Sequence, residues 1–218
     1  MARKSASEPA EHALVRRKDP QQKRSALTVQ SILQATLEIA KAEGFLNLGT
    51  RKIAERAGIS VGSLYQYFPT VEAILLAIYE ETASRVANKF REKMLAFMHL
   101  SMEAVGEKSL QLLLKEYEDN QLILHQMVVE VPQLTLTPGA ASFDRLLRAG
   151  LRIYFLQFSQ LRNKDVERVS FFLEIVIIGS LRNYLTNRPA QLSRKEFLED
   201  LNRVLVSYVR SQNWNLPT

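Results

Sequence analysis

Hydroxyl, amide and basic side chains lie close together between positions 50 and 67, and their chemistry is hydrogen bonding rather than bond breaking. Such groups bind phosphate oxygens and base edges of nucleic acid. We expect base contacts from Arg51, Val61, Gly62, Tyr65 and Gln66. We expect phosphate contacts from Thr50, Lys52, Ser60, Ser63 and Tyr67. The alternative for each side chain is a solvated or packed position without a ligand.

The types of these residues suit the groove of a duplex. Val61 can meet a thymine methyl, Gln66 can pair with an adenine, and Arg51 can grip a guanine. Gly62 has no side chain, so it permits close approach of the backbone. The hydroxyl groups suit phosphates, particularly where backbone N–H groups at a helix N-terminus point the same way.

Two short helices joined by a turn are predicted to position these residues. Thr50 is the expected N-cap of the first helix, and Gly58 can end that helix in a left-handed conformation. Ser60 is the expected N-cap of the second helix, with Leu64 and Phe68 on its inward side. This pattern is typical of a helix-turn-helix that presents its second helix to the major groove.

Charge and the preceding chain agree with this interpretation. Residues 1–70 hold 11 Lys and Arg against 6 Asp and Glu, a net of +5 out of +6 for the whole chain. A helix is predicted over residues 27–43. Residues 1–25 are polar and basic, and we expect either a solvated tail or a disordered arm that touches DNA.

The sequence lacks the residue patterns that metal binding, cofactor binding and catalysis require. Cysteine is absent, and the three histidines are scattered, so we expect neither a metal site nor a cofactor. No nucleophile–base pair, carboxylate pair or phosphate loop indicates an enzyme. The first residues lack an apolar signal segment, and the apolar run at 175–179 is too short to cross a bilayer. We therefore expect a cytoplasmic protein with no membrane partner.

Residues 26–80 resemble the N-terminal domain of the tetracycline-repressor (TetR) family of bacterial transcription regulators. The run that carries the resemblance is Ile39-Ala40, Gly44-Phe45, Thr50, Ile53-Ala54, Ala57-Gly58-Ile59-Ser60, Gly62-Ser63-Leu64-Tyr65, Tyr67-Phe68 and Glu72-Ala73. The resemblance implies an all-helical homodimer that binds a palindromic operator and releases it when a small molecule binds. It also implies DNA contacts at Thr50, Ser63, Tyr65 and Tyr67.

One position departs from the family pattern. Many relatives have a lysine that clamps a phosphate just before the acidic residue of the next helix, and this chain has Val71 there. The departure and the sparse charge of the second helix leave an alternative function open. That alternative is a protein-interaction adaptor on the same fold that does not bind DNA specifically.

The predicted fold class is all-α, with a three-helix domain over residues 26–70 and a larger helical bundle over residues 71–218. Helices are expected over residues 71–97, 104–116, 119–130, 164–187 and 193–211, with a loop at 133–139. Phe143, Leu147, Leu151, Tyr154, Phe155 and Phe158 recur at helical spacing and form an apolar stripe.

This stripe is either core or part of an effector cavity. If it lines a cavity, we expect a hydrophobic or aromatic small molecule as the ligand. The candidate effector-binding residues are Met94, Met98, Met127, Phe143, Tyr154, Phe158 and Glu174. Glu174 lies among apolar residues, so it either reaches the rim, pairs with Arg168 or Arg182, or faces the ligand.

The last two predicted helices have apolar stripes suited to pairing. They either close the core of one subunit or form a four-helix interface between two subunits, as the resemblance implies. The candidate interface residues are Val176, Ile177, Ser180, Leu181, Tyr184, Phe197, Leu201, Val204, Leu205 and Tyr208. A two-fold dimer would place two recognition helices on one palindrome.

Overall fold

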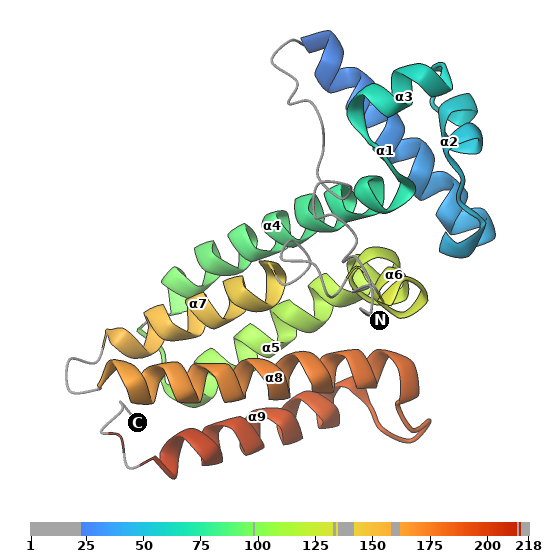
Figure 1. The fold of residues 1–218 in the computed structure, drawn as a ribbon. Coiled ribbons are helices and arrows are strands. Elements are labelled where there is room, and N and C mark those ends of the chain that lie inside the picture. Colours follow the sequence, from blue (N-terminus) through green and yellow to red (C-terminus); the bar gives the residue numbers. More distant parts are fainter. Residues whose placement is uncertain are drawn as a thin grey trace, which may run out of the picture. The chain divides into compact units, whose positions relative to one another are not determined.

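A computed structural model describes residues 23–97, 99–132, 134, 142–157, 162–212 and 214, with side chains from Ser25 in the first helix and from Asp144 in the seventh. These residues form helices and connecting turns, and none of them lies in a strand (Figure 1). The predicted all-α fold class is confirmed. The chain divides into two compact units, which are described separately below.

The first unit contains the described residues up to position 81 and those of 126–140. Its helices are α1 (Lys23–Glu43), the 3-10 turn η2 (Phe45–Asn47), α2 (Thr50–Arg56), α3 (Val61–Tyr67), the first part of α4 (Val71–Phe97), and α6 (Met127–Glu130). The segment 126–140 falls within the second domain predicted from the sequence, residues 71–218. Helix α1 begins at Lys23 rather than Leu27, and residues 1–22 of the expected arm lie outside the described residues.

The core of the first unit includes side chains with no exposure at all. Ile32 of α1, Ile53 of α2, and Leu64 and Phe68 at α3 are each 0% exposed. Helical periodicity places all four on inward faces, as predicted. The core therefore holds α2 and α3 at a set angle to α1.

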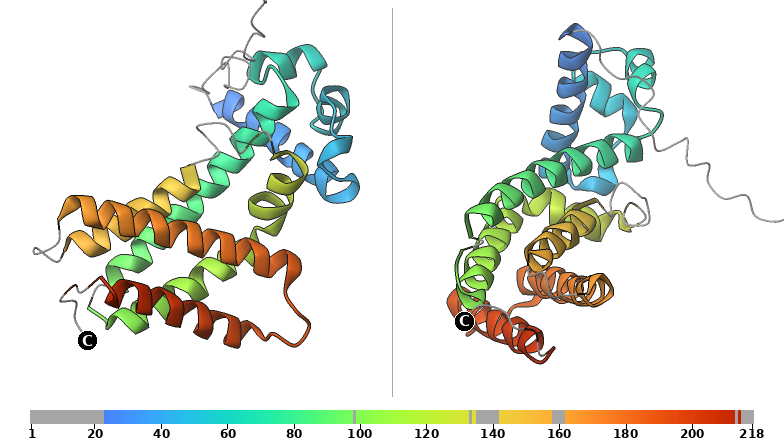
Figure 2. Two further views of the ribbon diagram at one scale, coloured as in Figure 1. Left: turned by 60° about the horizontal axis from the view of Figure 1, so that its bottom comes forward. Right: turned by 90° about the vertical axis from the view of Figure 1, so that its left-hand side faces the viewer.

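The second unit contains the rest of α4, the helices α5 (Met102–Asp119), α7 (Ser142–Leu156), α8 (Asn163–Asn187) and α9 (Arg194–Arg210), and most of the π-helical turn η3 (Leu122–Gln126). Figures 1 and 2 show α7 beside α8 and α5 beside α9. The predicted bounds of α4 agree with the structure. The helix predicted over 119–130 is instead η3 followed by α6, because α5 continues to Asp119 and is capped at Asn120.

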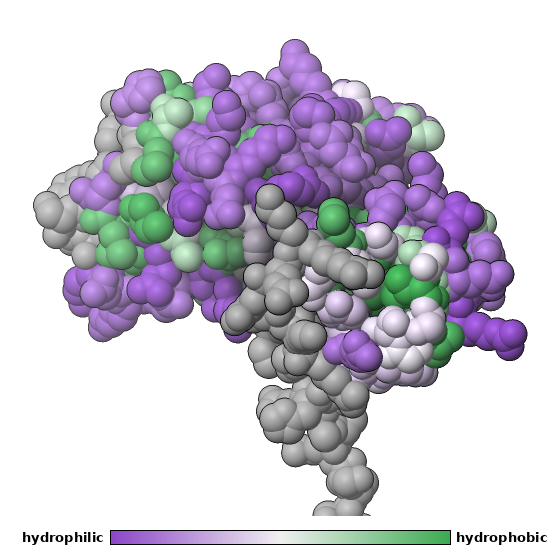
Figure 3. Space-filling model, turned by 90° about the horizontal axis from the view of Figure 1, so that it is seen from above, coloured by the Kyte–Doolittle hydropathy of each residue, from purple (hydrophilic) through white to green (hydrophobic). Residues whose placement is uncertain are grey.

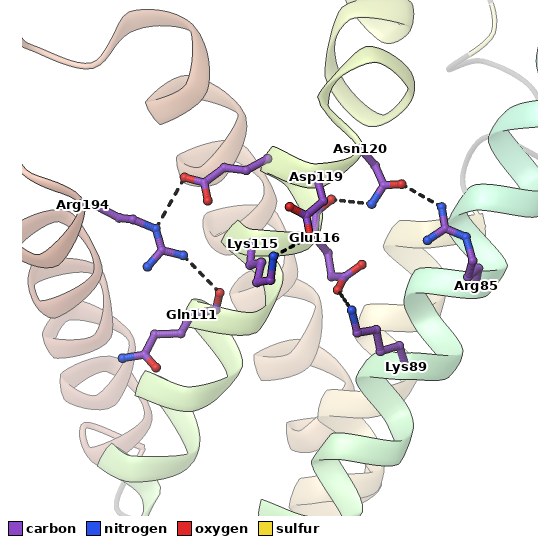
Figure 4. A network of polar contacts seen from close by, with 9 residues as sticks. Arg85, Lys89, Gln111, Lys115, Glu116, Asp119, Asn120 and Arg194 are labelled. Carbon is purple, nitrogen blue, oxygen red and sulfur yellow. Dashed lines mark hydrogen bonds and ion pairs between the residues drawn. The ribbon is translucent and has the colours of Figure 1, made fainter. Parts of the chain in front are cut away.

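Polar contacts join α4, α5 and α9 along one side of this unit (Figure 4). Lys89 of α4 pairs with the buried carboxylate of Glu116 on α5. Arg85 donates to Asn120 Oδ1 at 2.7 Å, and Arg194 of α9 lies 3.5 Å from Glu118. These contacts hold α5 between its two neighbours.

Helix α8 is the single helix of the described residues that by itself is long and apolar enough to cross a membrane. Helices α3 and α4 pass the same test only together, with a bend of 53° between them. Of the apolar window of α8, 44% is buried inside the structure. Length and composition are weak evidence for a membrane span, because the core helix of a globular bundle passes the same test. The face in Figure 3 is mostly hydrophilic, with its hydrophobic residues in separate groups.

Candidate functional site

The turn between α2 and α3 has the geometry that its sequence predicts. Gly58 has φ +69, the left-handed region that favours glycine. Its N–H donates to Glu55 O at 3.1 Å, and the N–H of Ile59 donates to Ala54 O at 3.0 Å. This pair of bonds satisfies the last carbonyls of α2 and reverses the chain within two residues.

Ser60 then starts α3. Its Oγ accepts a hydrogen bond from the N–H of Ser63 at 3.0 Å, and the two hydroxyls lie 2.8 Å apart. The N-cap predicted here is confirmed. The N-cap predicted at Thr50 was wrong, because the structure places Gly49 there without a side-chain bond and makes Thr50 the first residue of α2.

Because Thr50 does not cap α2, its hydroxyl has a different partner. Its Oγ1 lies 3.2 Å from the hydroxyl of Tyr65 on α3. Tyr67, two residues later, accepts a hydrogen bond from Ser25 Oγ of α1 at 3.2 Å. Each contact joins the ring of an α3 tyrosine to another helix, so both rings are oriented before any ligand arrives.

The outer face of α3 is open to solvent. Gly62, Tyr65 and Gln66 are exposed, while Val61 and Ser63 are half-buried. Since Leu64 and Phe68 fix the inner face, this helix presents a glycine, an amide and a tyrosine on one side with no charged group among them. Such a face can enter a groove without burying an unpaired charge.

Basic residues of α2 differ in how freely they can move. Arg51 is exposed and has no ion pair among the described residues. Lys52 pairs with Glu43 at 2.7 Å, and Arg56 pairs with Glu38 at 2.7 Å. Hydrogen bonds from Gln34 and Arg56 lower the pKa of Glu38. Ion pairs between exposed side chains contribute little to stability, so Lys52 can exchange its carboxylate for a phosphate at little cost.

A contact that the sequence analysis missed holds the end of α1. Glu130 of α6 accepts a hydrogen bond from the backbone N–H of Phe45 at 2.9 Å. Phe45 follows Gly44, which ends α1 with φ +84. The two partners are 85 residues apart in the chain, so no local pattern indicates their contact.

The second unit encloses a cavity of about 70 Å³ between α4, α5, α7, α8 and α9. Met94 and Tyr154, both predicted as effector-binding residues, line it. So do Leu147, Leu151 and Phe155 of the predicted stripe. Among the lining residues, polar side-chain atoms come from Ser109, Tyr154 and Asn202 alone, so the walls are almost entirely apolar.

Two other predicted effector-binding residues that the structure describes, Met127 and Glu174, are not among the residues that line this cavity. Met127 is fully buried in the first unit. Met98, Phe158 and the side chain of Phe143 lie outside the described residues. Glu174 is buried and pairs with Arg148 of α7, a partner that the sequence analysis did not consider. Its two predicted partners bind elsewhere, Arg168 to Gln212 at 2.6 Å and Arg182 to Asp144 at 3.7 Å.

The candidate interface residues on α8 and α9 fall into two sets. The first set is buried within the unit and comprises Ile177, Leu181, Tyr184, Leu201 and Leu205. The second set reaches the surface at least in part and comprises Val176, Ser180, Phe197, Val204 and Tyr208. The same helices expose Phe171, Phe172 and Ile175, which the sequence analysis did not single out. We refer to these side chains and Val204, the exposed large hydrophobic residues of α8 and α9, as the apolar face of these helices.

Comparison with known proteins gives the geometry a context. Residues 32–78 match the model of bacterial regulatory proteins of the tetR family. The chain is 40% identical over 58 residues to the HTH-type transcriptional repressor KstR of Mycolicibacterium smegmatis (strain ATCC 700084 / mc(2)155). That match covers 27% of this chain and 28% of the repressor, so it spans just over a quarter of the relative.

Solved structures match over most of the chain. A putative TetR-family regulator from Mesorhizobium loti MAFF303099 has a TM-score of 0.66 at 18% identity, covering 87% of this chain and 98% of that one. Thermus thermophilus FadR, a TetR-family repressor in complex with lauroyl-CoA, has a TM-score of 0.60 at 20% identity, covering 82% and 93%. At these identities the similarity establishes the shared fold.

Proposed function

This chain belongs to the tetR family of bacterial regulatory proteins through its helix-turn-helix domain, and from that premise we propose that it is a ligand-responsive transcriptional repressor. It binds a palindromic DNA operator as a homodimer in the cytoplasm and releases the operator when a small hydrophobic effector binds. The observation that carries this proposal is the solvent-open, uncharged outer face of α3, set by the Gly58 turn and the Ser60 cap.

In the proposed complex, α3 lies in the major groove and its outer residues read the bases. Val61, Gly62, Tyr65 and Gln66 supply the base contacts, and Arg51 reaches a base edge from α2. Thr50, Ser60, Ser63, Tyr67 and Lys52 bind phosphates. The orientation of both tyrosine rings by Thr50 and Ser25 supports this assignment, because ordered side chains lose less entropy on binding.

The homodimer forms through the apolar face of α8 and α9. Two-fold symmetry would then present two copies of α3 to successive major grooves, about 34–36 Å apart on one side of the duplex. The exposed apolar side chains of Phe171, Phe172, Ile175 and Val204 support this assignment, since large apolar side chains exposed on the same pair of helices suit an interface.

The effector binds in the apolar cavity of the second unit. Related FadR from Thermus thermophilus was solved with lauroyl-CoA, a molecule with a long apolar chain. The apolar walls of the cavity in this chain suit the same general class of ligand. Helix α4 contributes Phe90 and Met94 to the cavity and begins three residues after Phe68. It therefore connects the proposed effector site to the helix-turn-helix along the chain.

Binding of the effector would shift the population toward a dimer whose α3 helices no longer fit the operator. The relatives named above are regulators, and the proposed role includes no catalytic step. The alternative, an adaptor without specific DNA binding, is separated from this proposal by the experiment below.

The test is genomic footprinting with the purified protein at two salt concentrations. We expect protection of a palindromic site that weakens at the higher salt, because phosphate contacts release counterions. Gln66→Ala should weaken the site by about tenfold through loss of a base contact worth about 1–3 kcal/mol. Gln191→Ala, an exposed glutamine between α8 and α9, is the matched control and should bind like wild type. Diffuse binding that Gln66→Ala does not change would favour the adaptor.

A further inference from the structure

A second apolar space adjoins the cavity of the second unit. It is a groove of about 110 Å³ between α4 and α7, lined by Arg91, Met94, Leu95, Gly150, Ile153 and Tyr154. Leu95 and Ile153 are 62% and 53% exposed, so the groove lies at the surface of the unit. Its exposed wall is made of apolar atoms, because Arg91 contributes the methylene stem of its side chain.

The groove and the cavity are separated by a thin wall. Met94 and Tyr154 line both spaces. A Cβ on Gly150, in the wall of the groove, would lie 3.5 Å from Cε1 of Phe90, which lines the cavity. The backbone of α7 on the groove side therefore lies directly against a side chain that faces the cavity, and a single layer of side chains divides the two spaces.

The two shared residues differ in how easily they can move. Met94 is unbranched and has three rotatable bonds. Its sulfur accepts a hydrogen bond from the Ser109 hydroxyl at 3.1 Å, and a thioether sulfur is a weak acceptor. The ring of Tyr154 packs edge-on against the ring of Phe155, with the centroids 5.3 Å apart. A rotation of Met94 would therefore join the groove to the cavity while Tyr154 stays in place.

The volumes of the two spaces favour a long ligand. A water-sized group needs roughly 10–15 Å³ of such space, so the cavity of about 70 Å³ admits about five to seven such groups. On the same scale, the groove of about 110 Å³ admits about seven to eleven. An unbranched chain of about ten carbons is therefore too long for the cavity alone, but it fits if it continues past Met94 into the groove.

The polar groups of the walls determine the two ends of such a chain. The side chains of Ser109, Tyr154 and Asn202 expose almost no polar surface to the cavity, so the end that lies there must be apolar. At the groove, Arg91 is exposed, and no ion pair within the described part of the chain includes it. Arg152, the exposed arginine beside Ile153 in the sequence, is already paired with Glu167 at 2.9 Å. An anionic head group at the surface would pair with Arg91 and remain in water.

We propose that the groove between α4 and α7 is an outer subsite, and that one unbranched alkyl ligand occupies it together with the cavity. The chain passes Met94, its apolar end lies in the cavity, and its carboxylate lies by Arg91. Straight-chain carboxylates of about ten carbons are the chemical class that fits. This inference rests on the proposed function only in treating the cavity as a ligand site.

The first test is a titration of the full chain with undecanoate, without DNA and below the concentration at which undecanoate forms micelles. The methyl NMR signals of two isoleucines report on the two spaces, because Ile153 lines only the groove and Ile177 lines only the cavity. We expect both signals to shift along one binding curve. A shift of only one of these two signals, a shift of neither, or two different dissociation constants would overturn the proposal.

The second test measures the affinity for undecanoate by calorimetry in variants of the groove. Ile153→Ser should weaken binding about fivefold, because it removes apolar surface that the chain covers. Leu146→Ser is the matched control, since Leu146 is 40% exposed on the same helix and lines neither space. The control should bind within about 1.5-fold of wild type. Equal losses in the two variants would contradict an outer subsite.

The position of the carboxylate is tested in the same way. Arg91→Gln should weaken binding of undecanoate about threefold, the usual size of an exposed ion pair. Lys93→Gln removes the same charge from an exposed residue of α4 that does not line the groove, and it should bind like wild type. Equal affinities of these two variants would overturn the proposal. Since no DNA is present, operator footprinting and these titrations can fail independently of each other.

Discussion

Gly58 and Gly62 stand four residues apart in the helix-turn-helix, yet a methyl group has opposite consequences at the two positions. Gly58 has φ +69, where an L side chain is strained, although a Cβ there would meet nothing within 4 Å. Gly62 is helical, and a Cβ there would meet Ser60 Oγ at an ordinary 3.9 Å. The left-handed backbone at Gly58 therefore determines how a substitution there changes stability. At Gly62, helix propensity determines the change in stability.

Gly58→Ala should destabilise the protein by about 1 kcal/mol, the cost of a left-handed L residue. Gly62→Ala should stabilise it by about 0.5–1 kcal/mol, because alanine loses less backbone entropy than glycine in a helix. Urea denaturation of both variants checks these values. A Gly58→Ala protein as stable as wild type would mean that the turn relaxes to a right-handed conformation.

The same substitution at Gly62 separates stability from function. The proposed role of Gly62 is close approach of the α3 backbone to DNA, so the stabilised variant should bind the operator more weakly than wild type. At the residue scale, the absence of a side chain at Gly62 would allow close approach to DNA at a small loss of helix stability.

At the scale of elements, α7 and α8 are joined by charged side chains that lie among apolar residues. Arg148 pairs with Glu174, and its guanidinium also lies 4.7 Å from the ring centroid of Phe171. Asp144 lies 3.7 Å from Arg182, and burial raises the pKa of this carboxyl in spite of the nearby arginine. Compared with the unfolded chain, the folded protein therefore favours the neutral form of Asp144.

Asp144→Asn should be more stable than wild type at pH 7. A carboxyl with a raised pKa stabilises the fold fully below its ordinary pKa of 3.8 and loses that contribution as pH rises through the folded value. Asparagine stays neutral, so the difference between variant and wild type should vanish below pH 3.8. Thermal melts across pH 3–8 measure it.

Asp119 on α5 is the control of opposite sign. A hydrogen bond from Lys115 lowers its pKa, and the residue is exposed. Asp119→Asn should therefore show no gain at pH 7. Loss of stability in Asp144→Asn at pH 7 would mean that the attraction to Arg182 outweighs the burial of the carboxylate.

At the scale of the whole molecule, the proposed function requires two copies of the chain. The apolar side chains of Phe171, Phe172, Ile175 and Val204 are each about half exposed in the single chain. In an isologous interface each residue occurs in two symmetry-related copies, so one substitution changes two positions of the dimer.

Ile175→Asp should raise the dimer dissociation constant at least about 100-fold, because it buries two carboxylates without partners. Ile153→Asp is the matched control, since Ile153 of α7 is 53% exposed and Ile175 is 50% exposed. Sedimentation velocity should find the control dimeric. Dissociation of both variants, or of neither, would contradict an interface on α8 and α9.

Local sequence determined much of this protein. The Gly58 turn, the Ser60 cap and the bounds of α4 depend on residues within one helical turn of each other, so propensity and periodicity are enough to predict them. Thr50 shows that prediction from local sequence can fail even for residues that are near one another in the chain. Its hydroxyl lies by Tyr65, 15 residues away, and Gly49 is the N-cap.

Only the tertiary structure decided the partners of the buried polar groups. Glu174 pairs with Arg148 across 26 residues, Phe45 donates to Glu130 across 85, and Asn202 donates to Glu103 across 99. These contacts depend on which helix faces meet, and the apolar pattern of each helix leaves several arrangements open. A Cβ at Gly106 of α5 would overlap the side chain of Asn202 on α9, yet the sequence alone does not distinguish this glycine from the others.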